Sequence, residues 1–206
     1  MNKHAFIMLI ALITIFSFNE AKSLCQPGFS CCRMSTVSYN GCFYNILFCY
    51  RNNNGVLEYQ IDEINILLNQ NCNQLTLVNS ASSLAFWNYI SEKVRLDLLD
   101  FYQYPFPNCP STLVSVKQFY STCWALVNDG ANQQASLINC NSSIIYSCLT
   151  EYSYCRDQYG NLQQSIRTFA PAPDACSQIP FPGQLPPLGK TWEDNWTSTC
   201  MFTICQ

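Results

Sequence analysis

The cysteines are the residues whose type and number could do the most chemistry in this chain. There are 14 of them among 206 residues, and cysteine sulfur can close disulfides, bind a soft metal or act as a nucleophile. Structural zinc sites use cysteine pairs with about two to four residues between them, often together with histidine. Only Cys200 and Cys205 have that spacing. The sequence therefore predicts no metal site, and it suggests no cofactor.

Cys123 lies in a short segment that resembles a catalytic motif. The run from Ser121 to Leu126, Ser-Thr-Cys-Trp-Ala-Leu, is similar to the Gly-Ser-Cys-Trp-Ala-Phe stretch around the nucleophile of papain-like cysteine proteases. That resemblance implies a thiol activated by a histidine further along the chain. The single histidine is His4, and Lys117 stands where the family has its oxyanion-hole glutamine. We therefore predict that Cys123 is half of a disulfide.

Carboxylate pairs are the remaining catalytic possibility, because glycoside hydrolysis needs only two acids across a cleft. One histidine, close to the N-terminus, supplies no Ser-His-Asp triad and no histidine-ligated metal. The candidate acids are Asp62, Glu63, Asp97, Asp100, Asp129, Glu151, Asp157, Glu193 and Asp194. Their spacing selects no pair. A secreted carboxylate-dependent glycan hydrolase is therefore the alternative function, and a non-enzymatic role is preferred.

Trp192 and Trp196 are the candidate binding residues. They enclose the sequence Glu-Asp-Asn, and residues four apart face the same way on a helix or a turn. Two indoles on one side could clamp a sugar or an apolar side chain, because flat aromatic rings stack on such surfaces. The competing interpretation is that both rings pack beneath a disulfide formed by Cys200 or Cys205.

Two N-glycosylation sequons are present. Asn141-Ser-Ser and Asn195-Trp-Thr match the acceptor pattern without proline, so glycans are predicted at Asn141 and Asn195 in a eukaryotic source. The second sequon lies between the paired tryptophans. A glycan on Asn195 would compete with a ligand for that surface.

The first 23 residues have the layout of a secretory signal peptide. A short basic start precedes an apolar run from Ala5 to Phe18, and Ala21 and Ser23 are small residues before a cleavage point at Leu24. The run is shorter than the ~20 apolar residues of a membrane-spanning helix. We therefore predict removal of residues 1–23, a single extracellular domain over 24–206, and no membrane span in the mature chain.

Export explains the cysteine content. Disulfides persist in oxidising compartments, and the even cysteine count leaves no obligatory free thiol. For the adjacent pair Cys31 and Cys32, separate partners are preferred over a bond between the two. The predicted disulfide residues are Cys25, Cys31, Cys32, Cys42, Cys49, Cys72, Cys109, Cys123, Cys140, Cys148, Cys155, Cys176, Cys200 and Cys205.

Cysteine spacing also indicates an internal repeat. The interval 32–72 resembles 140–176, because each holds two cysteines seven residues apart and then a polar turn with glycine. Asn54-Gly55 is a strong signal for a tight hairpin turn. For Ser147–Tyr154 a helix and a strand are equally favoured. We predict two related β-hairpins: Gly41–Tyr50 with Val56–Ile61, and Ile144–Cys155 with Leu162–Phe169.

The middle of the chain has helical periodicity. From Ser82 to Tyr102 the apolar residues recur every three or four positions, with Glu92, Lys93, Arg95, Asp97 and Asp100 largely on the wet side. A second helix is predicted over Ser111–Val127. The proline-rich segment 170–189 is predicted to be extended and irregular.

These features predict a small disulfide-rich α+β domain with two related hairpin blocks flanking an amphipathic helical pair. The net charge of −3 offers no basic surface for nucleic acid, and 49% hydrophobic residues argue against disorder. The function expected is binding to an extracellular protein or carbohydrate. The protein would act at the cell surface, in a matrix or coat, or as a soluble signal.

Overall fold

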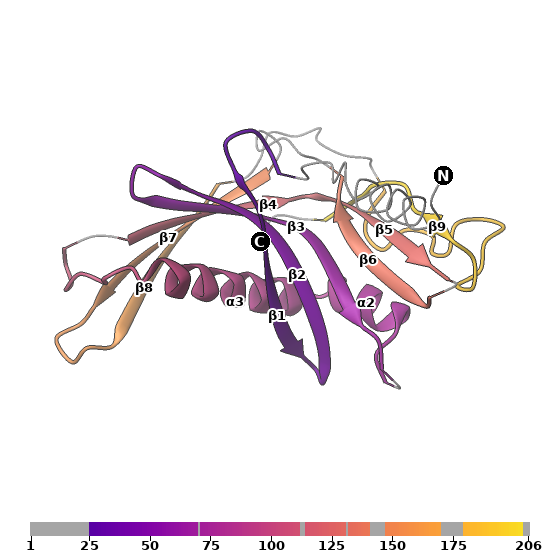
Figure 1. The fold of residues 1–206 in the computed structure, drawn as a ribbon, viewed down its shortest axis with the longest axis horizontal. Helices are drawn as coiled ribbons and strands as arrows, with labels where there is room; N and C mark the ends of the chain where they lie inside the picture. Colours follow the sequence, from indigo (N-terminus) through magenta and orange to yellow (C-terminus); the bar gives the residue numbers. More distant parts are fainter. Residues whose placement is uncertain are drawn as a thin grey trace, which may run out of the picture.

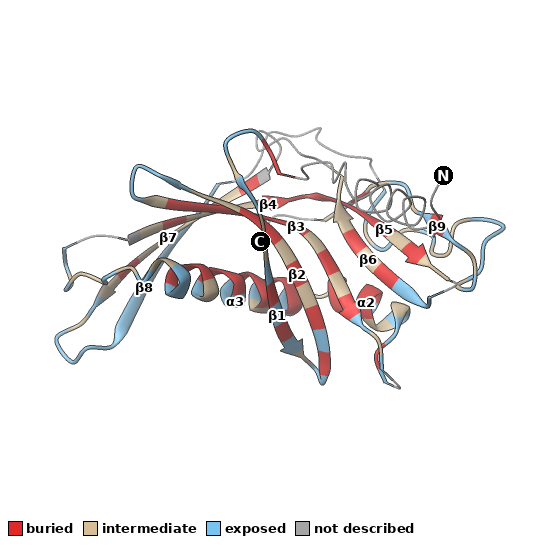
Figure 2. Ribbon diagram, in the orientation of Figure 1, coloured by how far each residue is buried: buried red, intermediate tan, exposed pale blue. Residues whose placement is uncertain are grey.

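The computed structural model describes residues 25–69, 71–111, 114–130, 132–140, 147–169 and 179–203. These residues form one 10-stranded sheet with helices across one side (Figure 1). The strand order along the main path is β10-β5-β6-β3-β4-β7-β8, while β1 and β2 join at β3 and β9 joins at β5. Buried residues line the strands where they meet the helices (Figure 2).

The first three strands form an antiparallel meander of β1 (Ser30–Tyr39), β2 (Cys42–Asn53) and β3 (Val56–Leu67). Asn-Gly pairs make both of its turns. Asn40 and Gly41 have φ values of 51° and 80°, and Asn54 and Gly55 have 53° and 87°. Positive φ at both central residues is what a two-residue hairpin turn requires, and asparagine and glycine adopt it most readily. The predicted first hairpin is thus confirmed.

β3 is the branch point of the sheet. Its first half pairs in parallel with β4 (Val114–Ser121) through Leu57 to Gln60. Its second half pairs antiparallel with β6 (Gln134–Asn139) through Glu63 to Asn65. Because β2 occupies the other edge along the whole strand, β3 has a neighbour on each side.

The rest of the sheet extends from this branch in two directions. On one side, β4 pairs with β7 (Ser147–Arg156), which forms a hairpin with β8 (Leu162–Phe169) as predicted. On the other side, β6 pairs with β5 (Cys123–Asp129). Two short strands, β9 (Trp196–Thr197) and β10 (Met201–Phe202), add to β5.

Two helices connect β3 to β4. The parallel pairing of these strands requires a crossover, which α2 (Gln74–Ala81) and α3 (Leu84–Tyr102) provide. Asn73 caps α2, accepting a hydrogen bond from the Thr76 backbone N–H, while the Thr76 hydroxyl accepts one from the Asn73 backbone N–H.

α3 confirms the amphipathic helix predicted over 82–102. Phe86, Trp87, Ile90, Val94 and Leu98 are buried against the sheet. The prediction of a solvent-exposed Arg95 was wrong. This side chain is buried because Tyr154 of β7 and Gln164 of β8 lie over it.

The second helix predicted over 111–127 is wrong. β4 and β5 occupy this region instead. In β4, burial alternates through Val116, Gln118 and Tyr120, as expected for a strand. In β5, Cys123 to Leu126 are all buried, so no alternation marks the strand. Apolar residues on both of its faces matched a helical spacing by coincidence.

The disulfides in the described residues join Cys25–Cys49, Cys31–Cys32, Cys42–Cys72, Cys109–Cys155 and Cys140–Cys200. Cys123 and Cys148 are disulfide-bonded as well. Separate partners for Cys31 and Cys32 were the wrong prediction, because the two residues bond to each other. Cys176 and Cys205 lie outside the described residues.

Over the described ranges the architecture is mixed α and β, mostly strands with two helices and several disulfides. A common origin of the two hairpin blocks stays a prediction. The signal peptide over 1–23 and the first nine residues of the proline-rich segment lie outside the described residues. Within the part of the chain that the structure describes, no helix combines the length and apolar character needed to cross a membrane.

Candidate functional site

A cavity of about 320 Å³ lies between the α2–α3 junction, the end of β4 and the C-terminal segment 179–203. Aromatic and aliphatic side chains make up most of its wall. We call it the aromatic pocket, and its principal lining residues are Leu84, Trp87, Tyr120, Pro180, Phe181 and Phe202.

Hydrogen bonding and ring packing position the inner wall of the aromatic pocket. Trp87 on α3 donates its indole N–H to the Ala81 carbonyl at 2.7 Å, which fixes the ring at the helix junction. Tyr120 at the end of β4 meets this indole edge to face, with ring centroids 5.2 Å apart. Both side chains are buried. Helix and sheet therefore hold the two rings in place before any ligand arrives.

The outer wall comes from the C-terminal segment. Backbone hydrogen bonds from Phe181 N to Phe202 O at 2.8 Å and from Phe202 N to Ile179 O at 2.7 Å join its two arms. The Cys140–Cys200 disulfide ties the same segment to the end of β6. Phe202 and Leu84 keep 41% and 52% of their surfaces exposed at the mouth of the pocket.

Two hydroxyl groups in this wall form no hydrogen bond of ordinary geometry within the part of the chain that the structure describes. The phenol oxygen of Tyr120 and Oγ1 of Thr203 are buried, and neither makes a hydrogen bond of ordinary geometry in the structure. Burial raises the pKa of Tyr120, an effect that the nearby Thr203 hydroxyl only partly offsets, so the phenol keeps its proton at neutral pH. Buried hydroxyls without partners are destabilising. A polar ligand atom could satisfy both.

The predicted pair Trp192 and Trp196 lies together on one turn, with ring centroids 5.2 Å apart. Trp196 is buried and donates its indole N–H to the Thr191 carbonyl at 2.8 Å, while Trp192 is half-buried against the core. The Asn128 side chain anchors the turn by donating to the carbonyl oxygens of Trp192 and Asp194. A binding role for this pair stays a prediction.

The sequons lie in different situations. Asn195 is exposed on the turn that carries the tryptophan pair. Asn141 lies outside the described residues. Glycosylation at both positions stays a prediction.

The candidate acids are spread over the fold. Asp97 pairs with Arg33 and Glu151 pairs with Lys117. Asp129, Asp157 and Asp194 accept hydrogen bonds within their own turns, and Asp100, Glu63 and Glu193 lie elsewhere on the chain. Among the described residues, none of these acids lines the aromatic pocket.

Asp62 is the one of these candidates that is buried, and it lies at an irregularity in the pairing of β2 and β3. Burial raises its pKa to about 6, and the negative charge of Glu63 adds to the shift. Asp62 and Glu63 are neighbours on one strand, so the two carboxylates do not oppose each other across a cleft.

A polar layer separates α3 from β4, β7 and β8. Arg95 donates to the Tyr154 phenol and lies over the Tyr152 ring, with its guanidinium carbon 3.7 Å from the ring centroid. Gln118 extends the layer by donating to the Ser91 hydroxyl at 2.7 Å and accepting from the Tyr152 phenol at 3.2 Å. These hydrogen bonds add to the apolar packing of Val94, Leu98 and Val116 in the same part of the molecule.

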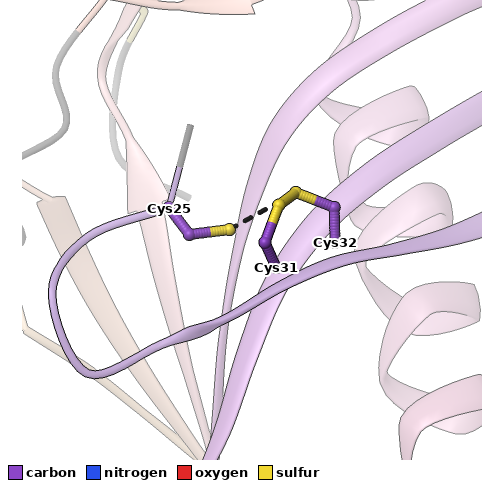
Figure 3. Close-up of side chains that lie close together, drawn as sticks. All are labelled: Cys25, Cys31 and Cys32. Atoms are coloured by element: carbon purple, nitrogen blue, oxygen red, sulfur yellow. Dashed lines mark hydrogen bonds between the residues drawn. A yellow bond between two sulfur atoms is a disulfide. The ribbon is translucent and has the colours of Figure 1, made fainter. Parts of the chain in front are cut away.

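Four sulfur atoms gather near the start of β1. The Sγ atoms of Cys25, Cys31 and Cys32 lie within 4.8 Å of one another (Figure 3). Cys25 is bonded to Cys49, and Cys31 to Cys32. Thiolates are the cysteine ligands of metals, so this cluster offers a metal no thiolate while both bridges are intact.

The sequence did not predict the aromatic pocket, because its residues come from four distant segments. Tyr120 lies in the segment 111–127, for which the sequence predicts a helix, and no sequence pattern links Phe181 and Phe202 to Trp87. Sequence patterns at the pocket residues indicate only local structure. Leu84 and Trp87 begin an amphipathic helix, and Pro180-Phe181-Pro182 interrupts regular structure. Comparison of the chain with family models, curated proteins and solved structures gives no match.

Proposed function

We propose that this is an extracellular binding protein whose aromatic pocket receives an aromatic ring bearing one hydroxyl group, as on a tyrosine side chain of a partner protein. The observation that carries the proposal is the pair of buried hydroxyls on Tyr120 and Thr203, which form no hydrogen bond of ordinary geometry in the described residues and lie in a mainly apolar wall. An apolar ring fits the wall, and its hydroxyl can bond to both groups.

The disulfides support an extracellular setting. Several bridges in a chain of this size fit a secreted protein, because thiols stay reduced in most cytosols. The proposal covers three settings: the protein could act at a cell surface, in a matrix or coat, or as a soluble signal. The proposal includes Trp192 and Trp196 as a second contact surface for a partner. A glycan on Asn195 would cover that surface.

Protein recognition is favoured over glycan hydrolysis and over sugar binding. Hydrolysis needs two acids across a cleft, whereas most of the candidate acids are engaged in ion pairs or turns, and none of those described lines the aromatic pocket. A sugar presents many hydroxyls, each of which needs a polar partner on burial. The aromatic pocket offers few such partners, since its main lining is carbon.

The direct test compares p-cresol with toluene by calorimetric titration of the whole exported protein. The two molecules differ only by the hydroxyl, which adds about 1.4 kcal/mol when it forms the missing hydrogen bond. We expect p-cresol to bind about tenfold more tightly than toluene. Methyl glucoside and a polysaccharide panel serve as the carbohydrate comparison.

Variants locate the effect. Tyr120→Phe removes the orphan hydroxyl, so the preference for p-cresol over toluene should fall to within about twofold. The matched control is Tyr44→Phe, since the Tyr44 phenol is buried but bonded to Ser80 at 2.8 Å. That control should lose about 1 kcal/mol of stability, whereas Tyr120→Phe should lose none. Equal binding of p-cresol and toluene to the wild type, or tighter binding of the glucoside, contradicts the proposal.

A further inference from the structure

The β1–β2 ladder contains a bulge made of cysteines. Ser30 pairs with Tyr50 and Arg33 pairs with Phe48, so two residues of β1 face one residue of β2 between these points. The two are Cys31 and Cys32, and the one is Cys49. Bulges of this type direct side chains away from the regular pleat. Here the bulge brings a bridged cysteine pair beside a residue of a second bridge.

The second bridge is in direct contact with the first. Cys25, the partner of Cys49, points toward the Cys31–Cys32 bridge, and its Sγ atom lies 3.5 Å from Sγ of Cys32 (Figure 3). Exposure falls steeply across the cluster. Cys31 is exposed and Cys32 is half-buried, whereas Cys25 and Cys49 keep only 8% and 1% of their surfaces exposed.

We infer that Cys31–Cys32 is a thiol-exchange site whose reduction is passed to the buried Cys25–Cys49 bridge. The co-reactant is a dithiol, either a small molecule or a reduced cysteine pair of another protein. Attack on a disulfide passes through a mixed disulfide, so the attacked cysteine must lie at the surface, and Cys31 is the exposed residue of this cluster.

In the first step a thiolate of the dithiol attacks Cys31 Sγ and breaks the Cys31–Cys32 bond, leaving Cys32 as thiolate. The Cys32 thiolate then attacks Cys25 Sγ, forming Cys25–Cys32 and releasing Cys49 as thiolate, which takes up a proton. The second thiol of the dithiol attacks its own sulfur in the mixed disulfide and releases Cys31 as a thiol. The dithiol is oxidised by two electrons and the protein gains two thiols, on Cys31 and Cys49.

The direction of the transfer follows from the contact. Cys32 is the residue whose sulfur touches Cys25, so the exposed Cys31 is the entry point and Cys32 is the relay. The products differ in accessibility as well. One thiol is at the surface and the other is in the core at the centre of β2, where no external thiol could reach directly.

The test is disulfide mapping of the folded wild-type protein after treatment with one molar equivalent of dithiothreitol. At a series of times, samples are unfolded in guanidinium chloride at mildly acidic pH together with N-ethylmaleimide, so that buried thiols are alkylated while disulfide exchange is slowed. They are then digested without reduction for mass spectrometry. We expect alkylation on Cys31 and Cys49 together with a new Cys25–Cys32 bridge. Alkylation on Cys31 and Cys32 at every time point overturns the relay, and so does first reduction of any other bridge or none.

Two variants make the test independent of a single map. The double variant C31S/C32S removes the entry point, and its Cys25–Cys49 bridge should be reduced at least about tenfold more slowly than in the wild type. The double variant C25S/C49S removes the acceptor, so alkylation should appear on Cys31 and Cys32. Unchanged reduction of Cys25–Cys49 in the first variant, with its other bridges intact by mapping, contradicts the inference.

Discussion

β3 and β8 hold the same position in two hairpins, yet they have opposite surroundings. Each follows a strand with two cysteines seven residues apart, Cys42 and Cys49 in β2 or Cys148 and Cys155 in β7. All residues of β3 from Leu57 to Asp62 are buried. All eight residues of β8 are exposed.

Position in the sheet accounts for this difference. β3 has β2 on one side, β4 and β6 on the other, and the apolar face of α3 beneath it. β8 pairs with β7 alone within the described residues, and α3 presents Arg95 rather than an apolar stripe to it. Burial is therefore decided by the neighbours that a strand receives in the fold, which local sequence does not specify.

The largest expected contrast is between equivalent truncations in the two strands. Ile64→Ala in β3 should lower the free energy of unfolding by about 3–4 kcal/mol, because a fully buried side chain leaves a cavity. Ile166→Ala in β8 should change it by less than about 0.5 kcal/mol, since 58% of Ile166 is already exposed. Urea denaturation measures both. A loss of similar size at both positions would contradict the conclusion that β3 contributes to the core and β8 does not.

Disulfide removal should act almost equally on the two hairpins. C42A/C72A and C109A/C155A each open one bridge, and the sequence separations are 30 and 46 residues. We expect each variant to lose about 2–4 kcal/mol, because a bridge acts mainly by restricting the unfolded chain. The same denaturation experiment decides this. A much smaller loss for C109A/C155A would show that β7 and β8 fold independently of the rest.

The contributions of Asp62 and Asp157 to stability should change with pH in opposite directions. Burial raises the folded-state pKa of Asp62 from 3.8 to about 6, so its contribution to stability declines as pH rises between these values. Asp62→Asn should therefore stabilise the protein by about 1–3 kcal/mol at pH 7 and by much less at pH 4. Melting temperatures of both proteins across that interval measure the change.

Asp157, in the turn between β7 and β8, provides the control. Slight desolvation opposes its ionisation, but hydrogen bonds from Asn161, Tyr159 and Gln163 outweigh this and lower its pKa. Its contribution is present above the ordinary pKa and is lost as pH falls through the lowered one. Asp157→Asn should therefore destabilise at pH 7 and converge with the wild type in acid. The same sign for both variants would contradict the assignment.

The smallest expected effects concern the hairpin turns. Gly55 and Gly160 have φ values of 87° and 83°, a region that other residues enter at a penalty. Alanine at either position should cost about 1 kcal/mol of stability. Because open space surrounds both positions, the two losses should be equal within error by thermal denaturation. A larger loss at Gly55 would mean that backbone strain costs more stability in the turn next to the central strand β3 than in the turn next to the peripheral strand β8.

Local sequence predicted those parts of the fold that depend on local physics. The Asn54-Gly55 turn and the apolar period of α3 were readable because backbone conformation and helix amphipathicity are properties of neighbouring residues. The strands β4 and β5 were missed because β5 is buried on both faces, which erases the alternation of a strand. Arg95 was predicted on the solvent-exposed face of the helix because its partners, Tyr154 and Gln164, are far away in the chain.

Sequence patterns were enough to predict that the cysteines form disulfides, that two hairpins are present and that one amphipathic helix lies within residues 82–102. Tertiary structure alone decided that β3 is central and β8 is peripheral, that Cys31 bonds to Cys32 beside Cys25, and that Trp87, Tyr120 and Phe202 share one pocket. The physical reason is the range of the interactions. Turns and periodicity act over a few residues, whereas burial, sulfur pairing and pocket walls join segments that only the folded chain brings together.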